Sequence, residues 1–248
     1  MIYRVTQIQR ECRVPVKVGM VDSGCGFSRS AFLDVNQRVV AQASFVFRDG
    51  GVEQVAPMAD QLGHGSALLG IIGHCAPDAE FVVAQIFRER LTTTAAQVAA
   101  SIDWLVDEQV DVINLSLGLR QDRDVLKLAC DRARRKGVIL VASTPARGEP
   151  VFPAAYEGVL RMTGDARCQP DEFSRLQTRL ADFGAHVKGE NGVVGASAAT
   201  AYLTGFIAQH LMEHPQHDLE ALTRWLCDAA TYQGAEVLPW QQADGEQA

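Results

Sequence analysis

Three short stretches of the chain carry residue types from which an acyl-transfer site is built. Asp22 ends an apolar stretch and leads into a glycine turn, and His64 stands between two glycines. Ser197 lies among small residues in the stretch 195–200. Each pattern is weak alone, but the order Asp, His, Ser along the chain is one of the orders in which unrelated catalytic triads occur.

The three side chains have complementary tasks in such a site. A serine hydroxyl is a poor nucleophile and needs a base within hydrogen-bond reach. A histidine suits that task because its pKa lies near neutrality, and a carboxylate on its other ring nitrogen fixes the tautomer. A serine in the first turn of a helix also has free backbone N–H groups beside it. We therefore expect Asp22 to orient His64, and His64 to activate Ser197, whose own N–H is an oxyanion donor.

Alternating apolar and amphipathic segments are expected to bring these residues together. We expect strands at residues 14–21, 80–87, 111–116, 138–142 and 159–163. We expect helices at residues 64–72, 94–109, 122–136 and 195–210. This alternation predicts an α/β class, with a mostly parallel β-sheet and helices on both faces. Ligands of such sheets bind at the carboxyl ends of the strands, which is where we expect the site.

These motifs resemble those of the subtilisin-like serine proteases, the subtilase family. The resemblance runs from about Val14 to Trp225, and the stretches that carry it are 21–24, 64–70, 112–118, 126–142 and 195–205. It implies a subtilisin-like fold, the triad named above and serine endopeptidase activity. The implied partner is a peptide or protein precursor, and the mechanism calls for no metal ion or organic cofactor.

The resemblance also implies where a substrate lies. An extended peptide would pair as an added strand with one segment, and its P1 side chain, the one before the scissile bond, would enter a pocket between two segments. The implied residues are Ser116, Leu117 and Gly118 on one wall and Ala142, Ser143 and Thr144 on the other.

One position departs from the family pattern. The family usually places an asparagine side chain in the oxyanion hole, and the ungapped alignment puts Ala146 there. Loss of such a donor typically lowers kcat by ~10²–10³-fold, which is far less than a whole enzymatic rate enhancement. We expect the hydroxyl of Thr144 or Ser143, or a water molecule, to supply the second donor.

Length and composition favour a single domain, residues 1–248. The chain has 248 residues, of which 47% are hydrophobic and 21% are charged, and its net charge of −7 argues against nucleic-acid binding. No apolar run is long enough to span a membrane, and neither a signal peptide nor a prosegment is evident. We therefore expect a cytoplasmic protein. We expect reduced, mostly buried thiols at Cys12, Cys25, Cys75, Cys130, Cys168 and Cys227.

Two functions stay open at this point. A compact, intracellular subtilase suits selective removal of a leader or segment from one precursor, with other enzymes of a peptide-modification pathway as further partners. The alternative is a weak or inactive subtilisin fold that binds peptides, which the missing oxyanion asparagine favours. His210, His214 and His217 follow the serine motif and are expected to be solvated, because Pro215 should end the helix.

Overall fold

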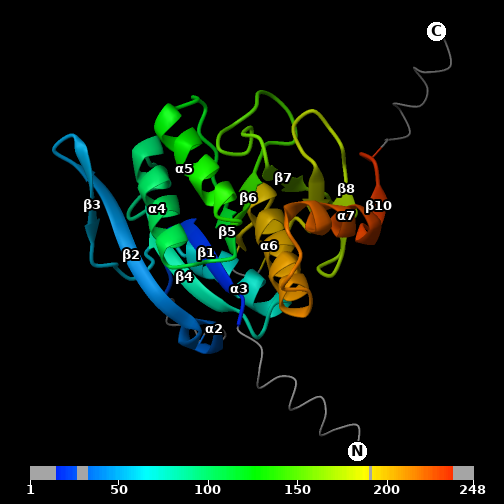
Figure 1. Ribbon diagram of the computed structural model, residues 1–248, viewed down its shortest axis with the longest axis horizontal. Helices are drawn as coiled ribbons and strands as arrows, with labels where there is room; N and C mark the ends of the chain where they lie inside the picture. The colour runs from blue at the N-terminus through cyan, green and yellow to red at the C-terminus, as the bar shows by residue number, and fades with distance from the viewer. Residues whose placement is uncertain (1–14, 27–32, 190–191, 237–248) are drawn as a thin grey trace, which may run out of the picture.

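The computed structural model describes residues 15–26, 33–189 and 192–236 (Figure 1). Its strands form one sheet in the order β10-β8-β9-β7-β6-β5-β1-β4-β2-β3. The strands are β1 (Lys17–Asp22), β2 (Val39–Arg48), β3 (Gly51–Val55), β4 (Glu80–Gln85), β5 (Val112–Leu115), β6 (Ile139–Ser143), β7 (Val159–Gly164), β8 (Phe173–Arg175), β9 (Phe183–Ala185) and β10 (Tyr232–Gln233). The helices are α2 (Leu33–Gln37), α3 (His64–Cys75), α4 (Ala95–Asp107), α5 (Asp124–Arg135), α6 (Ala196–Glu213) and α7 (Leu219–Ala229).

The centre of the sheet is parallel and buried on both faces. β1 pairs in parallel with β4 on one side and with β5 on the other, and the parallel pairing continues through β6 and β7. These strands are short apolar runs without alternation, as a sheet covered on both faces requires. Antiparallel pairs occur toward the edges, at β2–β3 and β8–β9. The predicted α/β class with a mostly parallel sheet is confirmed.

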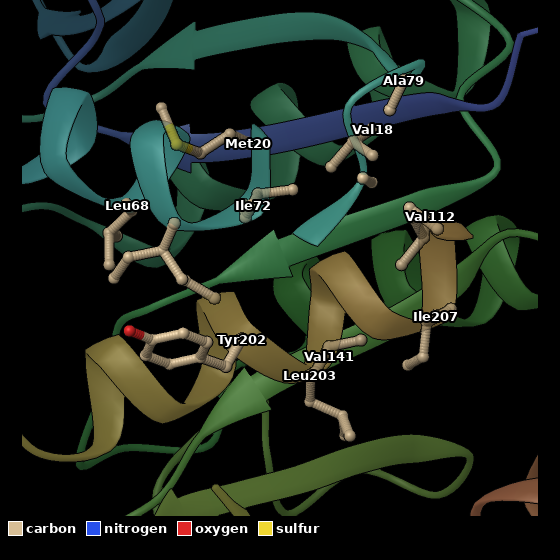
Figure 2. Close-up of a cluster of buried hydrophobic side chains, with 14 of the residues drawn as sticks. Val18, Met20, Leu68, Ile72, Ala79, Val112, Val141, Tyr202, Leu203 and Ile207 are labelled. Carbon is tan, nitrogen blue, oxygen red and sulfur yellow. The ribbon is translucent and has the colours of Figure 1, made fainter. Parts of the chain in front are cut away.

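Helices α3 and α6 cover one face of the sheet. Figure 2 shows side chains of both helices, among them Ile72 and Leu203, gathered with sheet residues such as Val18, Val112 and Val141. A buried Leu or Ile contributes roughly 1.5–3 kcal/mol, so this contact fixes both helices against the central strands. The start of α3 and the start of α6 carry the two motifs that contain His64 and Ser197.

Helices α4 and α5 pack on the opposite face, side by side (Figure 1). The start of α4 is closed by a capping box, in which Thr94 and Gln97 satisfy each other's backbone N–H groups. The ends of α5 match the helix predicted at 122–136 to within two residues. No helix in the described ranges has the length and apolar character that crossing a membrane would require.

Candidate active site

Asp22 is the last residue of the central strand β1 and is fully buried. Its backbone carbonyl accepts a hydrogen bond from Ile86 N at 2.8 Å, which ties the strand end to the residue after β4. Its side-chain Oδ1 accepts from Ser23 N at 2.7 Å and lies 2.8 Å from His64 Nδ1. Oδ2 has no hydrogen-bond partner among the described residues, so Oδ1 is the atom that orients the imidazole.

Two glycines allow α3 to begin directly against the turn after β1. Gly63 precedes the helix with a φ of 71°, a left-handed conformation that favours glycine. A Cβ on Gly65 would lie 2.3 Å from the carbonyl oxygen of Gly24, so only glycine permits this approach. Gly65 N donates to Ser23 Oγ at 2.8 Å. This close contact brings the ring of His64, the first helical residue, to Asp22.

A second aspartate, Asp60, supports the same helix start and was not anticipated from the sequence. Its carboxylate accepts hydrogen bonds from Leu62 N at 3.1 Å and Gly63 N at 2.8 Å. It also accepts from Ser66 N at 2.9 Å and from Ser66 Oγ at 2.7 Å. Asp60 is buried and satisfies backbone N–H groups that would otherwise lack partners at the helix terminus. The sequence signal for this role was an aspartate four residues before His64, close to the predicted start of a helix.

The electrostatic setting of His64 suits a general base. Burial lowers the pKa of His64, but the hydrogen bond to Asp22 and the negative charges of Asp22 and Asp60 outweigh burial, and the net pKa is raised above its ordinary value. The imidazolium form is therefore stabilised, as proton uptake from a nucleophile requires.

Ser197 lies in the first turn of α6, after Gly195, which has a φ of 72°. Ser197 and His64 line one cavity of about 300 Å³ at the carboxyl edge of the sheet. Within the described part of the chain no hydrogen bond joins the two side chains. Such bonds are often long in ligand-free sites and shorten when substrate binds. The structure thus brings Asp22, His64 and Ser197 into one site.

Buried polar groups tie Ser197 to β5. Ser116 Oγ donates to the backbone carbonyl of Ser197 at 3.3 Å, and Asn114 Nδ2 donates to Ser116 Oγ at 3.0 Å. Asn114 Oδ1 lies 3.1 Å from Thr204 Oγ1, two turns further along α6. Asn114 and Thr204 are fully buried. A buried, satisfied network of this kind fixes the position of α6 along its axis relative to β5.

The cavity places one predicted wall at the reacting serine. Ser116, Leu117 and Gly118 line it, as does Leu119. Four further lining residues were missed from the sequence: Phe87, Leu91, Thr92 and Thr93. Phe87 comes just after β4, at the same sheet edge as Asp22, and this position was a usable signal. Leu91 is 59% exposed, which leaves an apolar surface beside the cavity.

The second predicted wall lies beside the first but is not part of this cavity. Ala142, Ser143 and Thr144 are buried at the end of β6. Ser143 Oγ donates to the carbonyl of Leu117 at 3.3 Å, and Thr144 N donates to the carbonyl of Met162 at 2.7 Å. Ala146 is exposed in the loop that follows.

The expectation for the three histidines was wrong for His210, which is only 6% exposed. Its ring stacks on Trp225 at 3.8 Å between centroids, and its Nε2 lies 3.0 Å from His217 Nδ1. Helix α6 ends before Pro215 as expected, but the turn between α6 and α7 folds His217 back onto His210. No group of three potential metal ligands is found in the described ranges.

The described cysteines carry free thiols. Cys25, Cys130 and Cys168 are buried, and Cys75 and Cys227 are partly buried, whereas Cys12 lies outside the described residues. Cys25 is near the site, but burial and the charge of Asp60 raise its pKa to about 11. Its thiol is therefore protonated at neutral pH and is not an activated nucleophile.

Residues 15–161 match the subtilase family. The chain belongs to this family of serine proteases. It is 25% identical over 221 residues to a thermostable alkaline protease of Halalkalibacterium halodurans. That match covers 81% of this chain and 60% of the relative, so the chain corresponds to only part of that protein's length.

Two solved structures show the same fold as this subtilase. A cold-adapted subtilisin-like serine proteinase superposes with a TM-score of 0.69 at 21% identity, covering 87% of this chain and 84% of that one. An epidermin leader peptide processing serine protease from Staphylococcus aureus superposes with a TM-score of 0.64 at 18% identity. The latter match covers 85% of this chain and 68% of that one.

Proposed function

We propose that this subtilase is an active serine endopeptidase. The observation that carries the proposal is the 2.8 Å contact between His64 Nδ1 and the buried carboxylate of Asp22, in a site where His64 and Ser197 line one cavity. All three triad positions are filled by the residue types that the chemistry needs. Family membership supports the same activity.

The proposed reaction has two stages. Ser197 Oγ attacks the peptide carbonyl while His64 Nε2 takes the hydroxyl proton, and Asp22 stabilises the resulting imidazolium. His64 then returns the proton to the departing amine, which leaves an acyl-enzyme. Water, activated by the same imidazole, releases the acid. The backbone N–H of Ser197 is free to donate to the oxyanion, because an N–H in the first turn of α6 has no intrahelical acceptor.

We propose that the hydroxyl of Thr144 supplies a second oxyanion donor. The alternative donor, Ser143, already directs its hydroxyl to the carbonyl of Leu117. Thr144 directly follows β6 at the carboxyl edge of the sheet, where Asp22 also ends its strand.

We further propose a dedicated role in the cytoplasm, the removal of a leader or segment from a specific peptide precursor. The free thiols of the described cysteines suit a reducing compartment. The absent oxyanion asparagine suits a slow, selective enzyme, and the fold is shared with a leader peptide processing protease. The crosslinked small subunit of quinohemoprotein amine dehydrogenase is one precursor of this kind, and other enzymes of such a modification pathway would be partners.

The processing role is tested by comparing substrates. Purified protein is incubated with casein and with precursor peptides encoded beside its gene, and products are mapped by mass spectrometry. We expect cleavage at one site of one precursor and little degradation of casein, with all cleavage absent in Ser197→Ala. Rapid casein hydrolysis without sequence preference would contradict dedicated processing, although it would leave the endopeptidase proposal intact.

A further inference from the structure

Gln85, the last residue of β4, is a buried polar side chain that takes no direct part in the proposed reaction. It is 1% exposed. It pairs in register with Asp22 on the neighbouring strand β1, so it lies at the carboxyl edge of the sheet, where the active site is. A buried amide needs hydrogen-bond partners for its N–H groups and for its oxygen. The partners of Gln85 show which segments it holds together.

The amide of Gln85 joins two backbone segments. Its Nε2 donates to the carbonyl of Ser23 at 2.8 Å and to the carbonyl of Met58 at 3.0 Å. Its Oε1 accepts from Met58 N at 3.0 Å. This set of partners also fixes which way the amide faces, because a reversed amide would place its oxygen against two carbonyl oxygens. Gln85 thus links the turn after Asp22 to the loop that leads to His64.

The turn after β1 and this loop meet at two points. At the first point, the turn leaves room for the amide: Gly24 has a φ of 100°, and a Cβ there would lie 2.7 Å from Gln85 Nε2. At the second point, Asp60 N donates to the carbonyl of Cys25 at 3.3 Å. A side-chain amide therefore holds one end of the contact, and a backbone hydrogen bond holds the other.

Asp60 is the charged residue that this contact places. Burial lowers the pKa of His64, whereas Asp22, by its hydrogen bond and its charge, and Asp60, by its charge, raise it. In the described part of the chain these two carboxylates are the charged groups that act on His64. Asp22 is fixed by the central strand β1. Asp60 lies in the loop between β3 and α3, so its position depends on contacts such as those that Gln85 makes.

We propose that Gln85 is a positioning residue for the catalytic base, because its amide holds Met58, and with it Asp60, against the turn after Asp22. This role rests on the endopeptidase function proposed above. Gln85 has no hydrogen bond to His64 and acts through Asp60. Without the amide, the Asp60 carboxylate could move relative to His64, and a misplacement of about 1 Å caused far from the reacting atoms can cost ~10²-fold in rate.

The variant Gln85→Met tests the proposal, since methionine is also unbranched and of similar length but has neither the donors nor the acceptor of the amide. The readouts are the titration of the His64 imidazole by NMR and the pH dependence of kcat/KM. We expect the pKa of His64 to fall. The acid limb of kcat/KM should then move to lower pH, because catalysis needs the neutral imidazole. We also expect kcat to fall by about 10–10²-fold, with KM changed little.

Gln97→Met is the matched control. Gln97 is buried on α4, and its Nε2 donates to the carbonyl of Phe45 at 2.9 Å, so the same replacement removes a comparable hydrogen bond from another part of the fold. It should lower the stability of the protein and leave the pKa of His64 unchanged.

A double-mutant cycle with Asp60→Asn separates a positioning role from a general loss of structure. In Asp60→Asn the negative charge is already absent, so adding Gln85→Met should change the pKa of His64 only slightly further. An unchanged His64 pKa in a folded Gln85→Met would overturn the proposal. An equal shift with and without the Asp60 charge would overturn it too.

Hydrogen exchange of the Met58 N–H in the unmodified protein decides the matter if Gln85→Met fails to fold. Protection from exchange would support the hydrogen bond to Gln85, and exchange at the rate of a free amide would overturn the proposal. Failure of the endopeptidase function has a different signature. The unmodified protein would then hydrolyse no peptide and take up no fluorophosphonate at Ser197, while the NMR titration of His64 would still report on Gln85.

Discussion

Asp22 acts on His64 through one oxygen that is held in place by its own backbone neighbour. Oδ1 accepts a hydrogen bond from Ser23 N and lies 2.8 Å from His64 Nδ1. The Asp22 carboxylate is fully buried. A buried carboxylate in this geometry keeps the Nε2 of His64 free to accept a proton. The types and order of Asp22, His64 and Ser197 predicted that these side chains meet, and the structure places Asp22 at His64 and places His64 and Ser197 on one cavity. Their catalytic roles stay a prediction.

Thr144 is the residue on which the oxyanion proposal depends. Replacement by valine keeps the shape and removes the hydroxyl, and loss of one oxyanion donor lowers kcat by ~10²–10³-fold. We expect a loss of this size in Thr144→Val, with KM changed little, in steady-state hydrolysis of a cleaved peptide. Thr223→Val on α7 makes the same chemical change away from the site and should have no effect.

The double variant Ser143→Ala/Thr144→Val tests both candidate oxyanion donors together, by its kcat. If the double variant Ser143→Ala/Thr144→Val keeps the kcat of the unmodified protein, neither hydroxyl is the second donor. The sequence could not choose between the two residues, because the choice depends on the hydrogen bond from Ser143 to the carbonyl of Leu117, which joins segments 26 residues apart.

At the scale of elements, the N-terminus of α3 is the part of the fold that sets the properties of the base. Asp60 binds four donors there and contributes to the raised pKa of His64. In Asp60→Asn the negative charge is lost, so the pKa of His64 should fall. Because catalysis needs the neutral imidazole, the acid limb of kcat/KM should then move to lower pH.

The same variant should also be less stable, since an amide offers only one acceptor oxygen in place of two. Hydrogen bonds to charged groups contribute about 1.5–3 kcal/mol each, and we expect a loss of this order in the free energy of unfolding by urea. Asp103→Asn is the control for loss of a negative charge, because Asp103 is partly exposed on α4 and binds Arg132. It should leave the acid limb of kcat/KM unchanged. An acid limb that does not move in Asp60→Asn would contradict the assigned influence on His64.

The sequence predicted the central strands, which are buried on both faces, and missed the strands toward the edges of the sheet. Strands β1, β4, β5, β6 and β7 are continuous apolar runs, and each was anticipated to within a few residues. β2 has a mixed burial pattern, and β8, β9 and β10 have only two or three residues each, so they lack a recognisable period. Their formation depends on tertiary contacts rather than on local sequence.

At the scale of the whole molecule, the topology brings distant residues to one edge of the sheet. Asp22 and His64 are 42 positions apart, and the segment between them includes the hairpin β2–β3, which extends to one end of the molecule (Figure 1). Ser197 lies in the first turn of α6, and this helix packs on the central strands through the cluster shown in Figure 2. Alternation of strands and helices predicted this convergence, whereas the hydrogen bonds that Asp60 accepts at the start of α3 required the folded structure.

The most direct test of the account is covalent labelling of Ser197 by a fluorophosphonate, followed by peptide mapping. The account predicts one labelled peptide that contains Ser197, labelling that is abolished in Ser197→Ala, and a labelling rate that falls steeply in His64→Ala. Folded protein that takes up no label, or that is labelled equally well in Ser197→Ala, would contradict the claim that Asp22, His64 and Ser197 form a working nucleophilic site.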